Sequence, residues 1–98
     1  MELILNIDGE KKSFKQPDAV LALRVKQALD FATDLDKEFD PQKLKRIVDF
    51  ISYDLYEGKF TPDEFWAGMD ASELIPNIQK CLSVPFNKMY KSMEPLKN

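Results

Sequence analysis

Residues 40–58 read DPQKLKRIVDFISYDLYEG, and this stretch carries the clearest structural signal in the sequence. Asp40 is a typical N-cap, and Pro41 suits the first position of a helix. Gly58 follows where a left-handed C-terminal cap is expected. Between them, apolar residues recur at helical spacing and form one face: Leu44, Ile47, Val48, Phe50, Ile51 and Leu55. The stretch therefore predicts an amphipathic helix over residues 41–57.

The start of the chain predicts a β-hairpin. Apolar and polar residues largely alternate over residues 2–8, and Asp8-Gly9 then supplies the positive φ angles that a tight hairpin turn needs. Residues 10–15 read as a polar return strand with Phe14 as its main apolar anchor. A two-stranded hairpin is marginally stable alone, so we expect residues 2–16 to pack on the rest of the chain.

A helix over residues 18–33 is predicted between the hairpin and the central helix. Asp18 is a suitable N-cap for it. The helical pattern fades over residues 33–39, which we interpret as a connector. The residues expected to face the core share helical spacing and are Leu21, Val25, Ala28, Leu29 and Ala32.

Capping signals after Gly58 predict further helices. Thr61 and Glu64 form a capping box that opens a short helix over residues 62–68. A second box at residues 70–73 leaves two alternatives for the helix over residues 72–83. Either Ser72 caps a helix that holds Pro76 in its first turn, or a turn precedes a fresh helix at Pro76.

Pro85 is predicted to end that helix, and residues 86–93 are predicted to form a last, separate one. The fold class is therefore α+β and mostly α, with an N-terminal hairpin followed by four to five short helices. We expect residues 1–84 to form one globular domain and residues 85–98 to form a C-terminal amphipathic segment.

The composition excludes several kinds of site. The 98 residues contain no histidine and one cysteine, so His-based catalysis, zinc fingers and redox dithiols are ruled out. Cys81 lies in an apolar stripe and is interpreted as a core residue. The net charge of −3 argues against nucleic-acid binding. No apolar run is long enough to span a membrane and no signal peptide is recognisable, so we expect a cytoplasmic location.

Acidic and aromatic clusters have structural explanations. The run from Asp34 to Asp40 alternates like a calcium loop, but Phe39 replaces the required glycine and Lys45 the required glutamate. Asp63 and Glu64 lie at a helix N-terminus, where capping and the helix dipole account for them. The aromatic residues Phe60, Phe65 and Trp66 are expected in the core. We therefore predict neither a catalytic site, nor a metal site, nor a cofactor.

The C-terminal segment is the candidate binding site. Its apolar stripe at helical spacing consists of Phe86, Met89, Tyr90 and Met93, opposite Lys88, Lys91 and Ser92. Methionine suits surfaces that adapt to partners. Two interpretations stay open: a last helix folded onto the protein's own core, or a helix that docks on a partner. The edge of the hairpin is a second candidate.

Two blocks of sequence resemble the tail assembly chaperones of long-tailed phages and prophages of Gram-positive bacteria. They are LILNIDGEKKSF at residues 3–14 and FTPDEFWAGMDA at residues 60–71, which continues into ELIP at 73–76. The likeness covers about residues 2–83. It implies a non-enzymatic protein of the host cytoplasm, absent from the mature virion. This protein would bind and solubilise the tape measure protein, and its partners would include tail tube subunits.

Two other functions are weaker interpretations. The first is a small structural tail or head-completion protein. The second is a DNA-binding regulator, for which Lys43, Lys45 and Arg46 are the available basic residues. Asp49 and Asp54 follow on the same helix, which disfavours contact with phosphates.

Overall fold

The computed structural model describes residues 2–37 and 40–93. Within them a hairpin is followed by four α-helices, so the predicted α+β, mostly α class is confirmed. The elements are β1 (Glu2–Ile7), β2 (Glu10–Lys15), α1 (Ala22–Lys37), α2 (Pro41–Asp49), the π-helical η1 (Phe50–Leu55), α3 (Pro62–Ala67), the 3-10 turn η2 (Ala71–Glu73) and α4 (Leu74–Met93).

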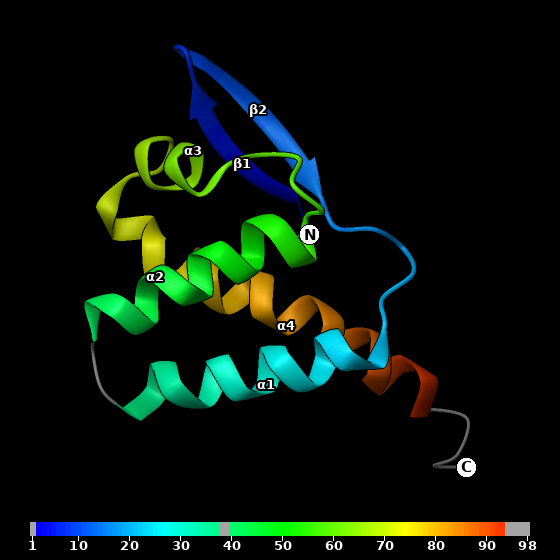
Figure 1. Cartoon of the computed structure of the whole chain (residues 1–98). Helices are drawn as coiled ribbons and strands as arrows, with labels where there is room; N and C mark the ends of the chain where they lie inside the picture. The colour runs from blue at the N-terminus through cyan, green and yellow to red at the C-terminus, as the bar shows by residue number, and fades with distance from the viewer. Residues whose placement is uncertain (1, 38–39, 94–98) are drawn as a thin grey trace.

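The hairpin and α3 lie on one side of the molecule and α1 on the other, with α2 and α4 between them (Figure 1). Strands β1 and β2 pair antiparallel, with Leu3 opposite Phe14. The predicted turn is confirmed, because Asp8 and Gly9 both have positive φ angles, of 52° and 79°. Helix α1 packs on α4 and on α2, and α3 packs on β1.

Gly68 fixes the contact between α3 and the hairpin. The backbone N–H of Asn6 donates to the carbonyl oxygen of Gly68 at 2.8 Å. A Cβ atom at position 68 would lie 2.7 Å from the backbone oxygens of both Asn6 and Glu64, closer than real contacts allow. The close approach of β1 to the end of α3 therefore requires glycine at this position.

The central helix has the predicted apolar face but a changed geometry. All six residues of that face are buried, and the Asp40 side chain accepts a 2.9 Å hydrogen bond from the Gln42 N–H. From Phe50 the helix widens into the π-helical η1, which ends with the Tyr56 N–H donating to the Ile51 carbonyl at 3.0 Å. Gly58 follows with φ of 74°, which confirms the predicted left-handed position.

Helix α1 differs from the predicted helix over residues 18–33. It begins at Ala22, so Asp18 is not its cap, and it continues to Lys37. The start is late because Lys88 binds the backbone carbonyl oxygens of Pro17 and Asp18 and holds this part of the chain as a linker with a bend at Asp18. The helix extends further because Leu35 still packs on the core.

The core face of α1 is also rotated from the predicted one. Ala28 is buried, and Phe31, Ala32 and Leu35 pack on the core around it. The Phe31 ring lies 4.9 Å from that of Phe50. Of the residues predicted to face inward, Leu21 precedes the helix and is 68% exposed, and Leu29 is 41% exposed. The prediction was wrong for these two residues.

Helix α4 runs without interruption from Leu74 to Met93, so the predicted break at Pro85 was wrong. Proline has no N–H, which leaves the carbonyl oxygen of Cys81 without its usual donor four residues ahead. The Gln16 side chain supplies one instead, donating from Nε2 to the Cys81 oxygen at 2.9 Å. The segments predicted as separate helices over residues 72–83 and 86–93 are therefore one helix.

The two capping signals after Gly58 have different outcomes. The box of Thr61 and Glu64 is confirmed, with both of its hydrogen bonds present. At the second, Asp70 caps the turn η2 by accepting from the Ser72 N–H, and α4 then begins at Leu74. Pro76 thus lies in the first turn of α4, as in the first alternative, but a turn precedes the helix, as in the second, and Ser72 belongs to that turn instead of capping α4.

The core is continuous from the hairpin to α4. Leu3 and Leu5 of β1 contribute to it, and Phe60 joins Phe14 and Tyr56 through ring contacts with centroids 5.0 Å apart. Phe60 and Phe65 are buried as expected, whereas Trp66 is 38% exposed, so the expectation for Trp66 was wrong. None of the described helices is both long and apolar enough to cross a bilayer.

Candidate functional site

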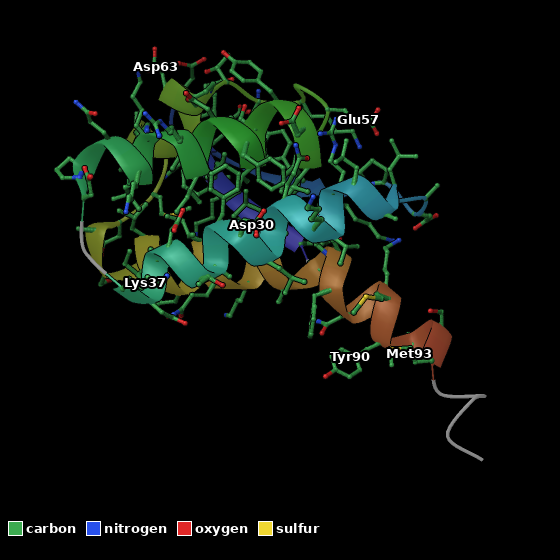
Figure 2. The ribbon with its side chains drawn as sticks, turned by 60° about the horizontal axis from the view of Figure 1, so that its bottom comes forward. Asp30, Lys37, Glu57, Asp63, Tyr90 and Met93 are labelled. Carbon is green, nitrogen blue, oxygen red and sulfur yellow. The ribbon has the colours of Figure 1, made fainter. Side chains whose placement is uncertain are left out.

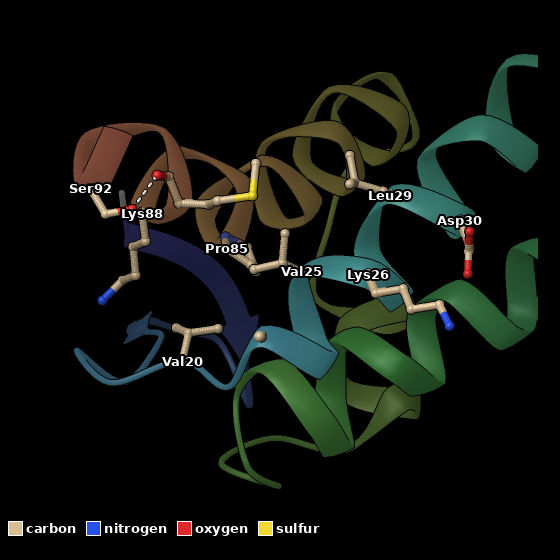
Figure 3. A pocket seen from close by; sticks show the side chains of 10 residues that line it. Val20, Val25, Lys26, Leu29, Asp30, Pro85, Lys88 and Ser92 are labelled. Atoms are coloured by element: carbon tan, nitrogen blue, oxygen red, sulfur yellow. Dashed lines mark hydrogen bonds between the residues drawn. The ribbon is translucent and has the colours of Figure 1, made fainter. Parts of the chain in front are cut away.

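A groove of about 560 Å³ lies between α1, α4 and the linker that joins β2 to α1 (Figure 3). The N-terminal half of α1 forms one wall, and the C-terminal half of α4 forms another. Six of its ten lining residues are apolar: Val20, Ala22, Val25, Leu29, Pro85 and Met89. The four polar ones are Lys26, Asp30, Lys88 and Ser92. Three segments that are distant in the sequence thus build one surface.

The walls of the groove remain uncovered because the two helices do not fill the space between them. Leu29 of α1 is 41% exposed and Met89 of α4 is 36% exposed, although both are large apolar side chains. Pro85 is buried at the α4 side, and Val20 reaches the groove from the linker (Figure 3). Such a surface favours contact with another apolar surface.

Lys88 holds the linker wall of the groove in place. Its Nζ donates to the Pro17 carbonyl oxygen at 3.2 Å and also to that of Asp18. Together with the bond from Gln16 to Cys81, this ties both ends of residues 16–18 to α4. Val20 lies two residues after Asp18, so the ammonium group of Lys88 helps to place it at the groove.

Two of the four predicted site residues line hollows beside α1. Met89 lines the groove together with Lys88 and Ser92. The sequence pattern predicted these two polar residues on the opposite face of the helix from Met89, and that prediction was wrong. Phe86 lines a second hollow of about 270 Å³. Leu29 lines both hollows.

Tyr90 and Met93 lie on the last two turns of α4, at the edge of the molecule (Figure 2). They are 45% and 40% exposed. The Tyr90 ring packs edge-on against Phe86 with centroids 4.6 Å apart. The four residues thus share one end of α4, and their role in binding a partner stays a prediction.

Tyr56 and Cys81 form a buried polar pair in the core. The Tyr56 hydroxyl lies 3.6 Å from the Cys81 sulfur, and both side chains are buried. Burial raises the pKa of the Cys81 thiol to about 11. Burial, followed by the neighbouring Cys81, raises the pKa of the Tyr56 hydroxyl well above its usual range. The thiol therefore stays protonated near neutral pH, which makes it a core group rather than a nucleophile.

The described residues also lack an arrangement suited to metal binding. Over residues 2–37 and 40–93, no group of three or more His, Cys, Asp or Glu side chains is placed to hold a metal ion. Asp34 and Asp36 of the acidic run belong to α1, and Asp40 caps α2. Glu38 and Phe39, on which the calcium-loop comparison also depends, lie outside the described residues.

The α1 half of the groove is not predicted from the sequence. Val25 and Leu29 fit a helical stripe and are therefore expected in the core, and no role is predicted for Val20. The available signal was the excess of apolar residues around the start of α1. Leu21, Leu23, Val25 and Leu29 are more than one face of a helix can bury beside Ala28, Phe31 and Ala32.

The fold and groove define a small helical protein that presents an exposed apolar surface. Its sequence matches the family model of the phage tail chaperone protein over residues 1–94, so the chain belongs to the phage tail chaperone family. No curated protein and no solved structure matched the chain. The family supports a role in tail assembly and interaction with tail proteins, and it suggests a non-enzymatic role.

Proposed function

We propose that this protein binds the tape measure protein of its phage or prophage in the host cytoplasm and keeps it soluble until the tail tube assembles. The observation that carries the proposal is the uncovered apolar groove on a chain of the tail chaperone family. A long helical protein with exposed apolar stripes aggregates unless a partner covers them. Such a partner needs an exposed apolar surface and no reactive chemistry.

The binding surface in this proposal is the C-terminal end of α4 together with the facing part of α1. Phe86, Met89, Tyr90 and Met93 are its α4 residues, and Leu29 is the central α1 residue. Four of these five are large apolar side chains that remain more than one third exposed: Leu29, Met89, Tyr90 and Met93. Amphipathic helices commonly bind by laying their apolar face into a groove between helices.

Co-expression tests the proposal. The full chain, carrying an affinity tag at its N-terminus, is produced with the tape measure protein of the same phage and recovered from the soluble fraction. We expect the tape measure protein to co-purify and to be soluble only in the presence of the chaperone. If it neither co-purifies nor gains solubility, the proposal is wrong.

The alternative is a small structural protein of the tail or of the completed head. Mass spectrometry of purified virions distinguishes the two functions, because a structural subunit remains in the particle in quantity. We expect this chain to be absent from virions and present in the lysate. Its recovery from virions at the level of known tail proteins would favour the structural function.

A further inference from the structure

The charge on α4 has the opposite sign to that of the rest of the chain. Residues 74–93 contain Lys80, Lys88 and Lys91 and no aspartate or glutamate. The whole chain carries −3, so the three lysines of α4 leave −6 on the remaining residues. The α4 side of the proposed binding surface is therefore basic on an acidic protein.

The excess of positive charge extends to the groove itself. Lys26 lines it from α1 and Lys88 from α4, and Lys91 lies on the same end of α4, outside the lining. Asp30 is the acidic residue of the lining. The nearby Asp18 carboxylate lies 4.0 Å from the Lys15 ammonium, which offsets its charge. An incoming surface thus meets apolar side chains beside two lysines and one aspartate, a net charge of +1.

We infer that the groove receives an amphipathic helix whose apolar side chains are flanked by aspartate and glutamate. This inference rests on the proposed function and specifies the segment of the tape measure protein that binds. Opposite charges across an interface favour the correct partner and suppress others. A basic amphipathic helix meets Lys26, Lys88 and Lys91 with like charge and is disfavoured.

The groove also limits the length of the bound segment. Its α1 wall runs from Ala22 to Asp30, nine residues of helix that span about 12 Å. This length matches about two turns of a bound helix. Apolar side chains at three or four positions on one face, spaced i, i+3, i+4 and i+7, therefore suffice to occupy it.

Peptides that tile the tape measure protein test this inference. Overlapping peptides of about 20 residues are titrated against the full chain and against the variant Lys26→Glu/Lys91→Glu. Lys88 is left unchanged because it anchors the linker. The control variant, Lys12→Glu/Lys45→Glu, makes the same charge change at exposed positions on β2 and α2.

We expect the peptides that bind to be amphipathic and acidic. We also expect the groove variant, and not the control, to bind them about tenfold more weakly in dilute salt, with a smaller difference at about 0.5 M salt. Binding of neutral or basic peptides, equal losses in both variants, or self-association of the chain through the groove would overturn the inference. If the wild-type chain binds neither any peptide nor the intact tape measure protein, the proposed function itself fails.

Discussion

The side-chain amide of Gln16 donates to the carbonyl oxygen of Cys81 at 2.9 Å, at the point where Pro85 deprives that oxygen of its helical donor. This contact joins the end of the hairpin to the middle of α4. It allows α4 to continue for two further turns beyond the proline, and those turns carry Lys88, Met89 and Met93. The groove therefore depends on a bond made far from it in the sequence.

Replacing Gln16 tests this dependence. Gln16→Leu leaves the buried Cys81 oxygen without a donor, and we expect the free energy of unfolding to fall by about 1–2 kcal/mol. Pro85→Ala restores a helical N–H at position 85, so Gln16→Leu should cost less in that background. Urea denaturation of the four proteins in a double-mutant cycle measures the coupling. Equal costs in both backgrounds would contradict the account.

Gly68 offers a second test of stability. A Cβ at this position would meet backbone oxygens of Asn6 and Glu64 at 2.7 Å, and neither can rotate away. We expect Gly68→Ala to destabilise the fold by about 2–3 kcal/mol. Ala67→Ser, at the exposed neighbour, should change stability by less than about 0.5 kcal/mol. Thermal unfolding followed by circular dichroism compares them, and an unchanged Gly68→Ala variant would refute the close contact.

Cys81 makes stability depend on pH at the alkaline end. The thiol ionises near its ordinary pKa of 9.0 in the unfolded chain but keeps its proton to about pH 11 in the folded one. Between these values the unfolded state holds fewer protons, so stability falls as pH rises, by at most about 1.4 kcal/mol per pH unit. Below pH 9 this contribution is constant. Tyr56 adds to the loss above its ordinary pKa of 10.0.

Urea denaturation at a series of pH values measures this loss. Cys81→Ala removes the titrating thiol, so we expect its stability to change little between pH 9 and pH 10, where the wild type loses stability. The comparison uses the slope with pH, because the substitution also lowers stability by leaving a small cavity. Identical slopes for the two proteins would show that the thiol is not protected in the folded state.

Lys88 is predicted to control the linker wall of the groove. Lys88→Met keeps the aliphatic chain but removes the donor to the Pro17 and Asp18 carbonyl oxygens. We expect thermolysin to cleave within residues 18–21 about fivefold faster, the effect of about 1 kcal/mol of local stability. Lys91→Met, at an exposed position on the same helix, serves as the control. Unchanged cleavage in Lys88→Met would mean that the linker is held by other contacts.

The two exposed tyrosines form a matched pair for the binding surface. Tyr90→Ser and Tyr53→Ser remove the same side chain from sites that are 45% and 59% exposed. We expect Tyr90→Ser alone to weaken binding of the tape measure protein, by about 1–2 kcal/mol. Titration calorimetry measures both variants. Equal affinities for the two variants would move the binding surface away from the end of α4.

The sequence predicts the elements that depend on neighbouring residues. The Asp8-Gly9 turn, the capping box of Thr61 and Glu64, and the apolar face from Leu44 to Leu55 are local signals, and all three are confirmed. The late start of α1 and the passage of α4 through Pro85 depend on Lys88 and Gln16. These residues contact backbone atoms more than sixty positions away. A local pattern does not contain such contacts.

In the candidate site, too, one part follows from a local sequence pattern and the other depends on contacts between distant segments. The apolar stripe from Phe86 to Met93 is visible as spacing within one helix, so an apolar face on this end of α4 could be predicted, and of its four residues Met89 lines the groove. The α1 wall could not, because Leu29 fits a core stripe equally well. Its exposure is decided by how α1 packs against α4 and α2.

The solubility of the tape measure protein tests the central claim most directly. The tape measure protein is co-expressed with the wild-type chain, with the groove variant Leu29→Glu, or with Tyr53→Glu as a control at another exposed site. The fraction of the tape measure protein that stays soluble is measured after sedimentation. Circular dichroism first establishes that both variants fold. We predict that wild type and Tyr53→Glu keep the tape measure protein in solution and that Leu29→Glu leaves it in the pellet. Equal solubility with all three proteins would contradict the account.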